Sequence, residues 1–147
     1  MNYEKSVRVK TSQEKAFKAV AGEIDNWWGR VDNPVIKVGD EFSIFFGKTV
    51  WRFVITEFSP YNKITWKCIK AEHYHEGLTN IKEEWLNTDL YWTFEKNDYF
   101  VEISLLHKGL TPDLNCYKVC ESAWDFFVPT SLKSYLETGR GSPYFEE

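Results

Sequence analysis

The stretch AWDFFVPTSLKSYLETGRGSP, residues 123–143, decides the fold of this chain. From Tyr117 onward, aromatic and small residues recur at about 100° per residue and form one stripe, which is typical of an amphipathic helix. Gly139 and Gly141 then provide a C-terminal stop. The pattern predicts a long C-terminal helix whose aromatic face covers another layer of structure. The stripe consists of Tyr117, Cys120, Trp124, Phe127, Val128, Ser131 and Tyr135.

Pro129 lies inside this predicted helix, on the side opposite the stripe. An interior proline removes a hydrogen bond and kinks a straight helix, at a cost of about 3 kcal/mol. A helix that bends around a curved sheet, convex toward solvent, lowers that cost. We therefore expect Pro129 on a convex, polar face. Phe126 falls on the same face, which predicts cover by a loop or a contact between two copies in a homodimer.

The N-terminal part of the chain alternates between strand and helix patterns. Residues 3–10, YEKSVRVK, alternate as a strand does. Thr11 followed by Glu14 matches a capping box, and Gly22 can end the helix that it begins. A short helical turn, EIDNWWG, is expected at residues 23–29.

Most of the remaining chain predicts antiparallel strands. Three runs with apolar residues at every second position, 39–47, 49–58 and 63–69, form a meander. Residues 89–110 predict a hairpin that turns at 96–98. The segment 70–88 has no clean period, so we expect a loop with a short strand near Trp85.

This element order predicts one α+β domain over residues 1–147. A curved antiparallel sheet wraps around the long C-terminal helix, and two short helices lie between the first and second strands. Any gap between sheet and helix would be a pocket.

Composition limits the function classes. The formal net charge of −4 and the absence of a basic run argue against binding of nucleic acid. No apolar run approaches the roughly 18 residues of a membrane span, and the N-terminus has no secretory h-region. The three cysteines form no disulfide framework, so we expect a reducing, cytoplasmic location. No cofactor motif is present.

Specific motifs resemble the helix-grip, START-like (SRPBCC) superfamily, and within it the branch related to the activator of the heat-shock-90 ATPase. They are WW at 27–28, SPYNKITW at 59–66 and LLHKGL at 105–110, followed by the segment quoted above. The resemblance covers nearly the whole chain. It implies a START-like domain with a hydrophobic cavity, but not a particular chemistry, because a fold does not fix a function.

We expect a small hydrophobic or aromatic molecule to bind between the sheet and the C-terminal helix. One alternative is a cyclase- or hydratase-like enzyme with His107 as its general base. Another, by analogy with the family name, is an interaction module that modulates a chaperone ATPase. The aromatic residues can also simply fill a core. The expected ligand-binding residues are Trp51, Phe53, Trp66, Trp92, Phe94, His107, Trp124 and Phe127.

Two polar groups keep two interpretations each. The segment HYHE at 73–76 can be a polar loop. Its two histidines and Glu76 could instead hold a metal, but no second cluster of ligands is evident in the sequence. Cys116 and Cys120, one helical turn apart, are small apolar helix residues or a redox or metal pair. We expect no metal from either.

Overall fold

Seven strands form one antiparallel sheet in the computed structural model, which describes residues 1–144. The order across the sheet is β1-β7-β6-β5-β4-β3-β2, so each strand from β2 to β7 pairs with its neighbour in sequence and β1 closes beside β7. The bounds are β1 (Tyr3–Val9), β2 (Arg30–Val31), β3 (Glu41–Phe46), β4 (Thr49–Ser59), β5 (Lys63–Glu72), β6 (Asp89–Lys96) and β7 (Val101–Lys108).

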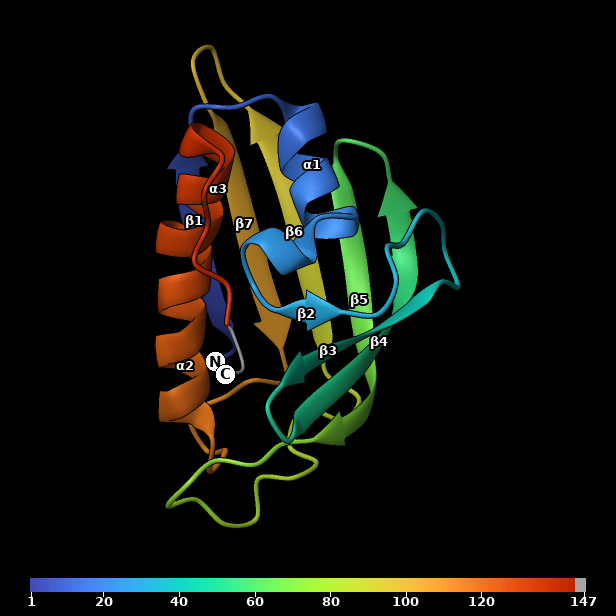
Figure 1. Cartoon of the computed structure of the whole chain (residues 1–147), viewed down its shortest axis with the longest axis vertical. Helices are drawn as coiled ribbons and strands as arrows, with labels where there is room; N and C mark the ends of the chain where they lie inside the picture. The colour runs from blue at the N-terminus through green and yellow to red at the C-terminus, as the bar shows by residue number, and fades with distance from the viewer. Residues whose placement is uncertain (145–147) are drawn as a thin grey trace.

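Helices cover this sheet from two places in the chain. The helix α1 (Gln13–Ala21) packs against β6, and the 3-10 turn η1 (Ile24–Asn26) follows it. The C-terminal run consists of α2 (Tyr117–Phe126), η2 (Phe127–Leu132) and α3 (Lys133–Thr138), and it lies alongside β1 (Figure 1). Asp125 on α2 accepts a hydrogen bond from the Tyr3 hydroxyl of β1 at 2.7 Å. The predicted α+β, helix-grip arrangement is confirmed.

The alternation that predicted the strands also predicted the core. Alternate residues over most of β3 to β7 are buried, as expected for a sheet with one covered face, while Phe46 at the end of β3 is half-buried. The strand β2 was not predicted, because two residues are too few to show a period. The buried set is Phe42, Ile44, Trp51, Phe53, Ile55, Ile64, Trp66, Cys68, Leu90, Trp92, Phe94, Val101, Ile103, Leu105 and His107.

The predicted cap of the first helix is wrong by one residue. The N-cap is Ser12 and not Thr11, because Ser12 has extended backbone angles and its hydroxyl accepts from the Lys15 amide at 3.1 Å. Glu14 makes an i,i+4 ion pair with Lys18 at 3.2 Å, without a capping-box role.

The predicted strand near Trp85 is also wrong, since Trp85 lies in a tight turn. The strand β5 continues to Glu72, and the chain then leaves the sheet as the expected loop. It returns through two backbone bonds to Cys68, whose N–H donates to Thr88 at 2.9 Å and whose carbonyl accepts from Asn87 at 2.8 Å. These two bonds join the end of the loop to β5 without forming a further strand.

The proline in the C-terminal run is accommodated by a wider helical segment. Residues Phe127–Leu132 form a π-helix, in which hydrogen bonds join residues five apart instead of four. Pro129 has no N–H to contribute, and the wider turn brings both Ser131 and Leu132 inward, where they are buried. The amphipathic stripe was predicted, but Leu132 was not part of it.

The two C-terminal glycines have different roles. Gly139 caps α3 with a left-handed backbone (φ 85°), and its N–H donates to the Tyr135 carbonyl at 2.8 Å. Gly141 permits close approach, because a Cβ there would lie 2.3 Å from the Asn26 carbonyl oxygen. The segment after α3 therefore returns against η1.

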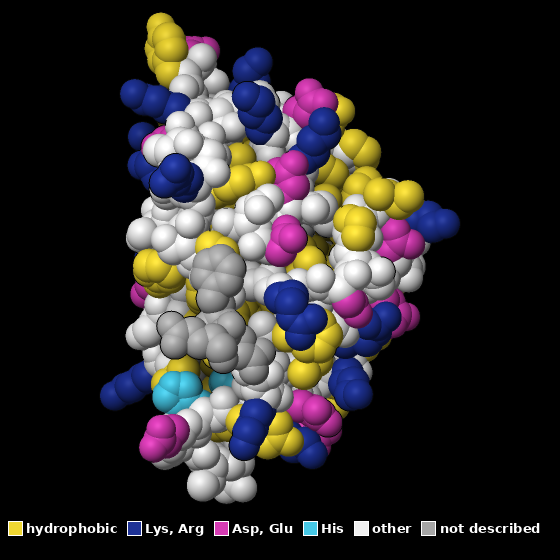
Figure 2. Space-filling model, viewed as in Figure 1, with side chains coloured by type: hydrophobic (Ala, Val, Ile, Leu, Met, Phe, Trp, Pro, Cys, Tyr) yellow, Lys and Arg dark blue, Asp and Glu magenta, His cyan; other side chains and the backbone are white. Residues whose placement is uncertain are grey.

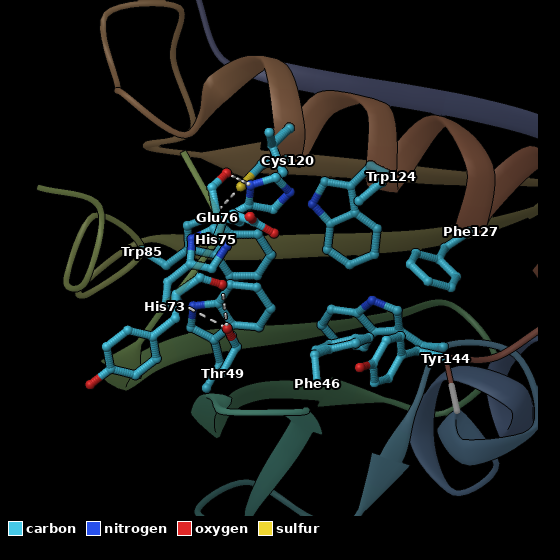
Figure 3. A pocket seen from close by; sticks show the side chains of 15 residues that line it. Phe46, Thr49, His73, His75, Glu76, Trp85, Cys120, Trp124, Phe127 and Tyr144 are labelled. Carbon is cyan, nitrogen blue, oxygen red and sulfur yellow. Dashed lines mark hydrogen bonds between the residues drawn. The ribbon is translucent and has the colours of Figure 1, made fainter. Parts of the chain in front are cut away.

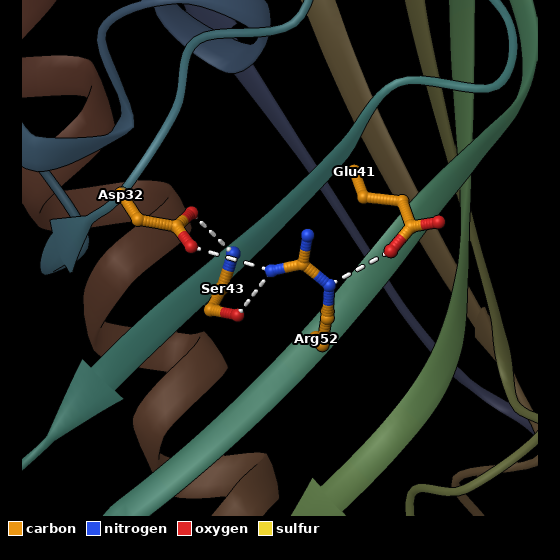
Figure 4. A network of polar contacts seen from close by, with 4 residues as sticks. All are labelled: Asp32, Glu41, Ser43 and Arg52. Carbon is orange, nitrogen blue, oxygen red and sulfur yellow. Dashed lines mark hydrogen bonds and ion pairs between the residues drawn. The ribbon is translucent and has the colours of Figure 1, made fainter.

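Arg52 of β4 connects the outer surface of the sheet to the segment before β3 (Figure 4). Its guanidinium contacts Glu41 at 2.8 Å, the Ser43 hydroxyl at 2.8 Å and Asp32 at 3.3 Å. Both carboxylate partners, Glu41 and Asp32, are partly solvent-exposed, so these two ion pairs contribute little to the stability of the fold.

Charges of both signs are dispersed over the face seen in Figure 2, with hydrophobic side chains between them. Among the described residues, no helix is both long and apolar enough to cross a membrane.

Candidate ligand pocket

A pocket of about 310 Å³ opens at one end of the space between sheet and C-terminal helix. Its floor comes from β3 and β4, one side from the 73–85 connection, and the opposite side from α2 and η2. Aromatic side chains dominate the wall. The lining residues are Trp28, Phe46, Thr49, Trp51, His73, Tyr74, His75, Glu76, Trp85, Val119, Cys120, Ala123, Trp124, Phe127 and Tyr144.

Four stacked indole rings build the inner wall of this pocket. Trp85 stacks on Trp51 with ring centroids 3.9 Å apart and lies parallel to Trp124 at 6.0 Å. Trp124 in turn stacks on Trp28 at 4.7 Å. Offset stacking stabilises such a row beyond the apolar area that it buries. The row joins four separate segments of the chain, two of which are turns, and so fixes the pocket wall in place.

The pocket has two chemically different ends (Figure 3). His73, His75, Glu76 and Cys120 gather at one end, beside Trp85. Phe46, Phe127 and Tyr144 form the other, which is purely aromatic. A bound molecule would therefore meet polar and sulfur atoms on one side and ring faces on the other.

His107 lies in the core and does not line the pocket. Its Nδ1 is 3.2 Å from the Trp124 indole nitrogen, which can only donate, so the imidazole proton belongs on Nε2. Nε2 then donates to the Thr88 hydroxyl at 2.9 Å, and that hydroxyl donates to the Trp85 carbonyl at 2.7 Å. Complete burial lowers the pKa of His107 to about 3. The side chain is a neutral connector between β7, α2 and the Trp85 turn.

Of the residues expected to bind a ligand, Trp51, Trp124 and Phe127 line the pocket. Phe53, Trp66, Trp92, Phe94 and His107 pack in the core instead. The first helix and the turn after η1 pack over two of them: the ring centroids of Trp27 and Trp92 lie 5.8 Å apart, and those of Phe17 and Phe94 lie 5.6 Å apart.

Sequence reasoning did not select several wall residues. Trp28 and Trp85 stand outside any strand or helix period, and Tyr144 follows the last helix. The only available signal was the unusual density of tryptophan outside the strands.

The HYHE segment and the helix cysteines meet in an unexpected combination. His75 is exposed, and its Nδ1 lies 3.0 Å from the Glu76 carbonyl. His73 turns inward, and one nitrogen of its imidazole ring lies within 4.8 Å of the sulfur atoms of Cys116 and Cys120. Both cysteines are free thiols. The neighbouring Cys120 thiol and burial raise the pKa of the Cys116 thiol well above its ordinary value.

Comparison with protein-family models and with curated proteins finds no match. Solved structures do match. The Aha1 dimer from Colwellia psychrerythraea superposes with a TM-score of 0.78 and 22% identity, over 96% of this chain and 99% of that one.

Two further structures have the same architecture at lower identity. Protein MLL2253 from Mesorhizobium loti matches with a TM-score of 0.71 and 16% identity, over 86% of this chain and 90% of that one. DynU16, from the dynemicin biosynthetic locus, matches with a TM-score of 0.72 and 16% identity, over 94% of this chain but only 48% of its own. At these identities the likeness concerns fold alone: the chain has the helix-grip fold of these structures.

Proposed function

We propose that this protein binds a small aromatic or apolar molecule in the pocket beside Trp51, Trp85 and Trp124. The observation that carries the proposal is the cavity of about 310 Å³ walled by stacked indoles. Ligand pockets begin at roughly 300 Å³, so the volume favours a molecule of one or two fused rings over a sterol or a long acyl chain.

The two ends of the pocket suggest how such a molecule would lie. A ring would stack toward Phe46 and Phe127, where only aromatic side chains are present. A polar substituent would point toward the exposed His75 and Glu76 at the other end. A ligand with one apolar and one hydrogen-bonding end fits this arrangement better than a pure hydrocarbon.

Tryptophan fluorescence tests the proposal, because four tryptophans line the pocket. The titrants are small aromatic acids and alcohols, with a fatty acid and a sterol for comparison. Saturable quenching by the small aromatics supports the proposal. An unchanged signal across the whole panel contradicts it.

A matched pair of variants locates the binding. Ala123 lies on the pocket wall, whereas its neighbour Ser122 is exposed on the same helix and does not line the pocket. Ala123→Phe should fill the pocket and weaken binding at least about tenfold, a loss of about 1.4 kcal/mol. Ser122→Phe should bind like the wild type. Equal affinity in the two variants would place the ligand elsewhere.

The alternative functions have less support. His107 has both ring nitrogens engaged and is outside the pocket, so the geometry does not favour a general-base enzyme. The chaperone-module hypothesis stays a prediction.

A homodimer has a specific observation in its favour. Phe126 is 43% exposed on α2, and the structural neighbour from Colwellia psychrerythraea is described as a dimer. We therefore propose α2 as a contact between two copies of the chain.

A further inference from the structure

Three metal-ligating side chains from distant parts of the chain meet behind the polar end of the pocket. They are His73, directly after β5, Cys116 at the start of α2, and Cys120 one turn later. One ligand atom of each lies within 4.8 Å of the other two. All three are buried, at 5%, 0% and 3% exposure respectively. Solvent therefore has little access to these side chains.

The backbone on both sides of this cluster is held in place. The Cys120 N–H donates to the Cys116 carbonyl at 2.9 Å, which puts the two thiols on one face of the helix. The His73 N–H donates to the Lys82 carbonyl at 3.0 Å. The next residue, Tyr74, exchanges two hydrogen bonds with the Thr49 hydroxyl, at 2.9 and 3.0 Å. The cluster is preorganised by these contacts.

The imidazole of His73 lacks the partner that burial normally requires. Its Nδ1 is buried and has no hydrogen-bond partner among the described residues. Buried polar atoms almost always have such a partner, and a missing one is costly. His107, the other buried histidine, has both ring nitrogens satisfied. The indole nitrogens of Trp51, Trp66 and Trp92 are also buried without a partner, so the argument for a ligand at His73 rests on the two thiols beside its ring.

A hydrogen bond to sulfur supports the same conclusion. The Trp85 indole N–H donates to the Cys120 sulfur at 3.3 Å. Hydrogen-bond partners of this kind orient the ligands of a metal.

We propose that His73, Cys116 and Cys120 bind one zinc ion. Thiolate and imidazole are the donors that zinc prefers, whereas calcium and magnesium require oxygen ligands. In tetrahedral zinc sites the ligand atoms lie about 3.8 Å apart, so small side-chain rotations suffice from the observed separations. The ion replaces two thiol protons, which are released to solvent. Two thiolates then balance its charge, so that the buried site is neutral.

The fourth coordination position adjoins the aromatic pocket, because His73 and Cys120 also line it. Three protein ligands with one position left for water or another molecule is the arrangement of zinc sites that are not purely structural. The zinc proposal does not depend on the pocket's own ligand.

Metal titration of the full-length protein tests the proposal. The protein is stripped with a chelator, kept reduced with a phosphine, and titrated with Zn²⁺ in competition with a chromophoric chelator. We expect one zinc per chain by native mass spectrometry. Co²⁺ in its place should give a thiolate-to-cobalt charge-transfer band. Absence of stoichiometric zinc binding overturns the proposal.

Single substitutions identify the ligands. Cys116→Ser, Cys120→Ser and His73→Asn should each weaken zinc binding more than about 100-fold, since even the loss of an outer-shell partner costs 10–100-fold. Cys68→Ser is the matched control, because Cys68 is a third buried cysteine and lies on β5, away from this cluster. Unchanged affinity in the first three variants contradicts the assignment.

X-ray absorption of the zinc-loaded wild type gives an answer that needs no variant to fold. Two sulfur ligands at about 2.3 Å and a nitrogen at about 2.0 Å support the site. A first shell of oxygen only shows surface binding and overturns the proposal. Conversion of Cys116 and Cys120 to a disulfide without zinc uptake would do the same.

Discussion

Among single residues, the two buried histidines show how environment decides the role of one residue type. His107 lies at the end of β7, where an indole, a hydroxyl and a carbonyl form one hydrogen-bonded chain around it. His73 lies just beyond β5 with an unpartnered Nδ1 and two thiols nearby. In the first arrangement both ring nitrogens have partners, and in the second Nδ1 has none among the described residues.

The buried, neutral His107 should make stability depend on pH. Its pKa is about 3 in the folded protein and 6.5 when exposed, so the unfolded chain takes up a proton between these values. The free energy of unfolding therefore falls as pH drops below 6.5, by roughly 2 kcal/mol at pH 5, and is unaffected above it. Urea unfolding at pH 7.5 and pH 5 in chelator-treated buffer measures this loss.

Substitution isolates the contribution of this histidine from the other titrating groups. His107→Gln should be less stable at pH 7.5 but should lose roughly 2 kcal/mol less than the wild type on going to pH 5. His75→Gln removes an exposed histidine and should keep the wild-type pH dependence. If His107→Gln shows the full wild-type loss, His107 is not the group responsible.

At the scale of elements, Ser131 joins three segments that are distant in sequence. Its hydroxyl donates to the Trp27 carbonyl at 2.6 Å and accepts from the Ser142 N–H at 2.7 Å. It is fully buried within the π-helical segment. One hydroxyl thus holds η2, the turn after η1 and the C-terminal segment together.

Replacing this hydroxyl should be costly. Ser131→Ala leaves a buried carbonyl and an amide without partners, so we expect a loss of about 2–4 kcal/mol in the free energy of unfolding. Ser122→Ala, on the exposed face of the same helical run, should change stability by less than about 0.5 kcal/mol. Urea unfolding monitored by tryptophan fluorescence distinguishes the two. A loss below about 1 kcal/mol in Ser131→Ala would show that the three segments are held together by other contacts.

Periodicity could predict the elements but not their irregular parts. The alternation of Trp51, Phe53 and Ile55 sufficed to place β4 and its buried face. The π-helical segment could not be predicted, because it depends on how the helix meets Trp27 and the returning C-terminal segment. The turn at Trp85 could not be predicted for the same reason, because Asn87 and Thr88 at its end form their backbone hydrogen bonds with Cys68 of β5.

For the whole molecule, the sequence predicted a space under the helix but not where it lies. Trp66, Trp92 and Phe94 have the same period as Trp51, and the packing of α1 and of the turn after η1 over them is what places them in filled core. The proximity of His73 to the two cysteines could not be predicted from the sequence either. His73 is more than forty residues from the two cysteines in sequence, and it lies in a loop without a period.

The exposed Phe126 raises a question of assembly. It is 43% exposed on α2 and contacts Phe127 edge-on at a centroid distance of 5.2 Å, so an apolar pair reaches from the pocket wall to the surface. A second copy of the chain would remove this surface from water, which is favourable by roughly 25 cal/mol for each Å² of apolar area.

Removing the ring tests this assembly without disturbing the core. Phe126→Ser should lower the sedimentation mass from dimer to monomer while the circular dichroism spectrum and the Tm stay close to those of the wild type. Tyr99→Ser is the matched control, because it removes another exposed aromatic side chain, 88% exposed in the turn between β6 and β7. That variant should keep the wild-type mass. A wild-type chain that sediments as a monomer at all concentrations, or a Phe126→Ser variant with unchanged mass, would exclude α2 as the dimer contact.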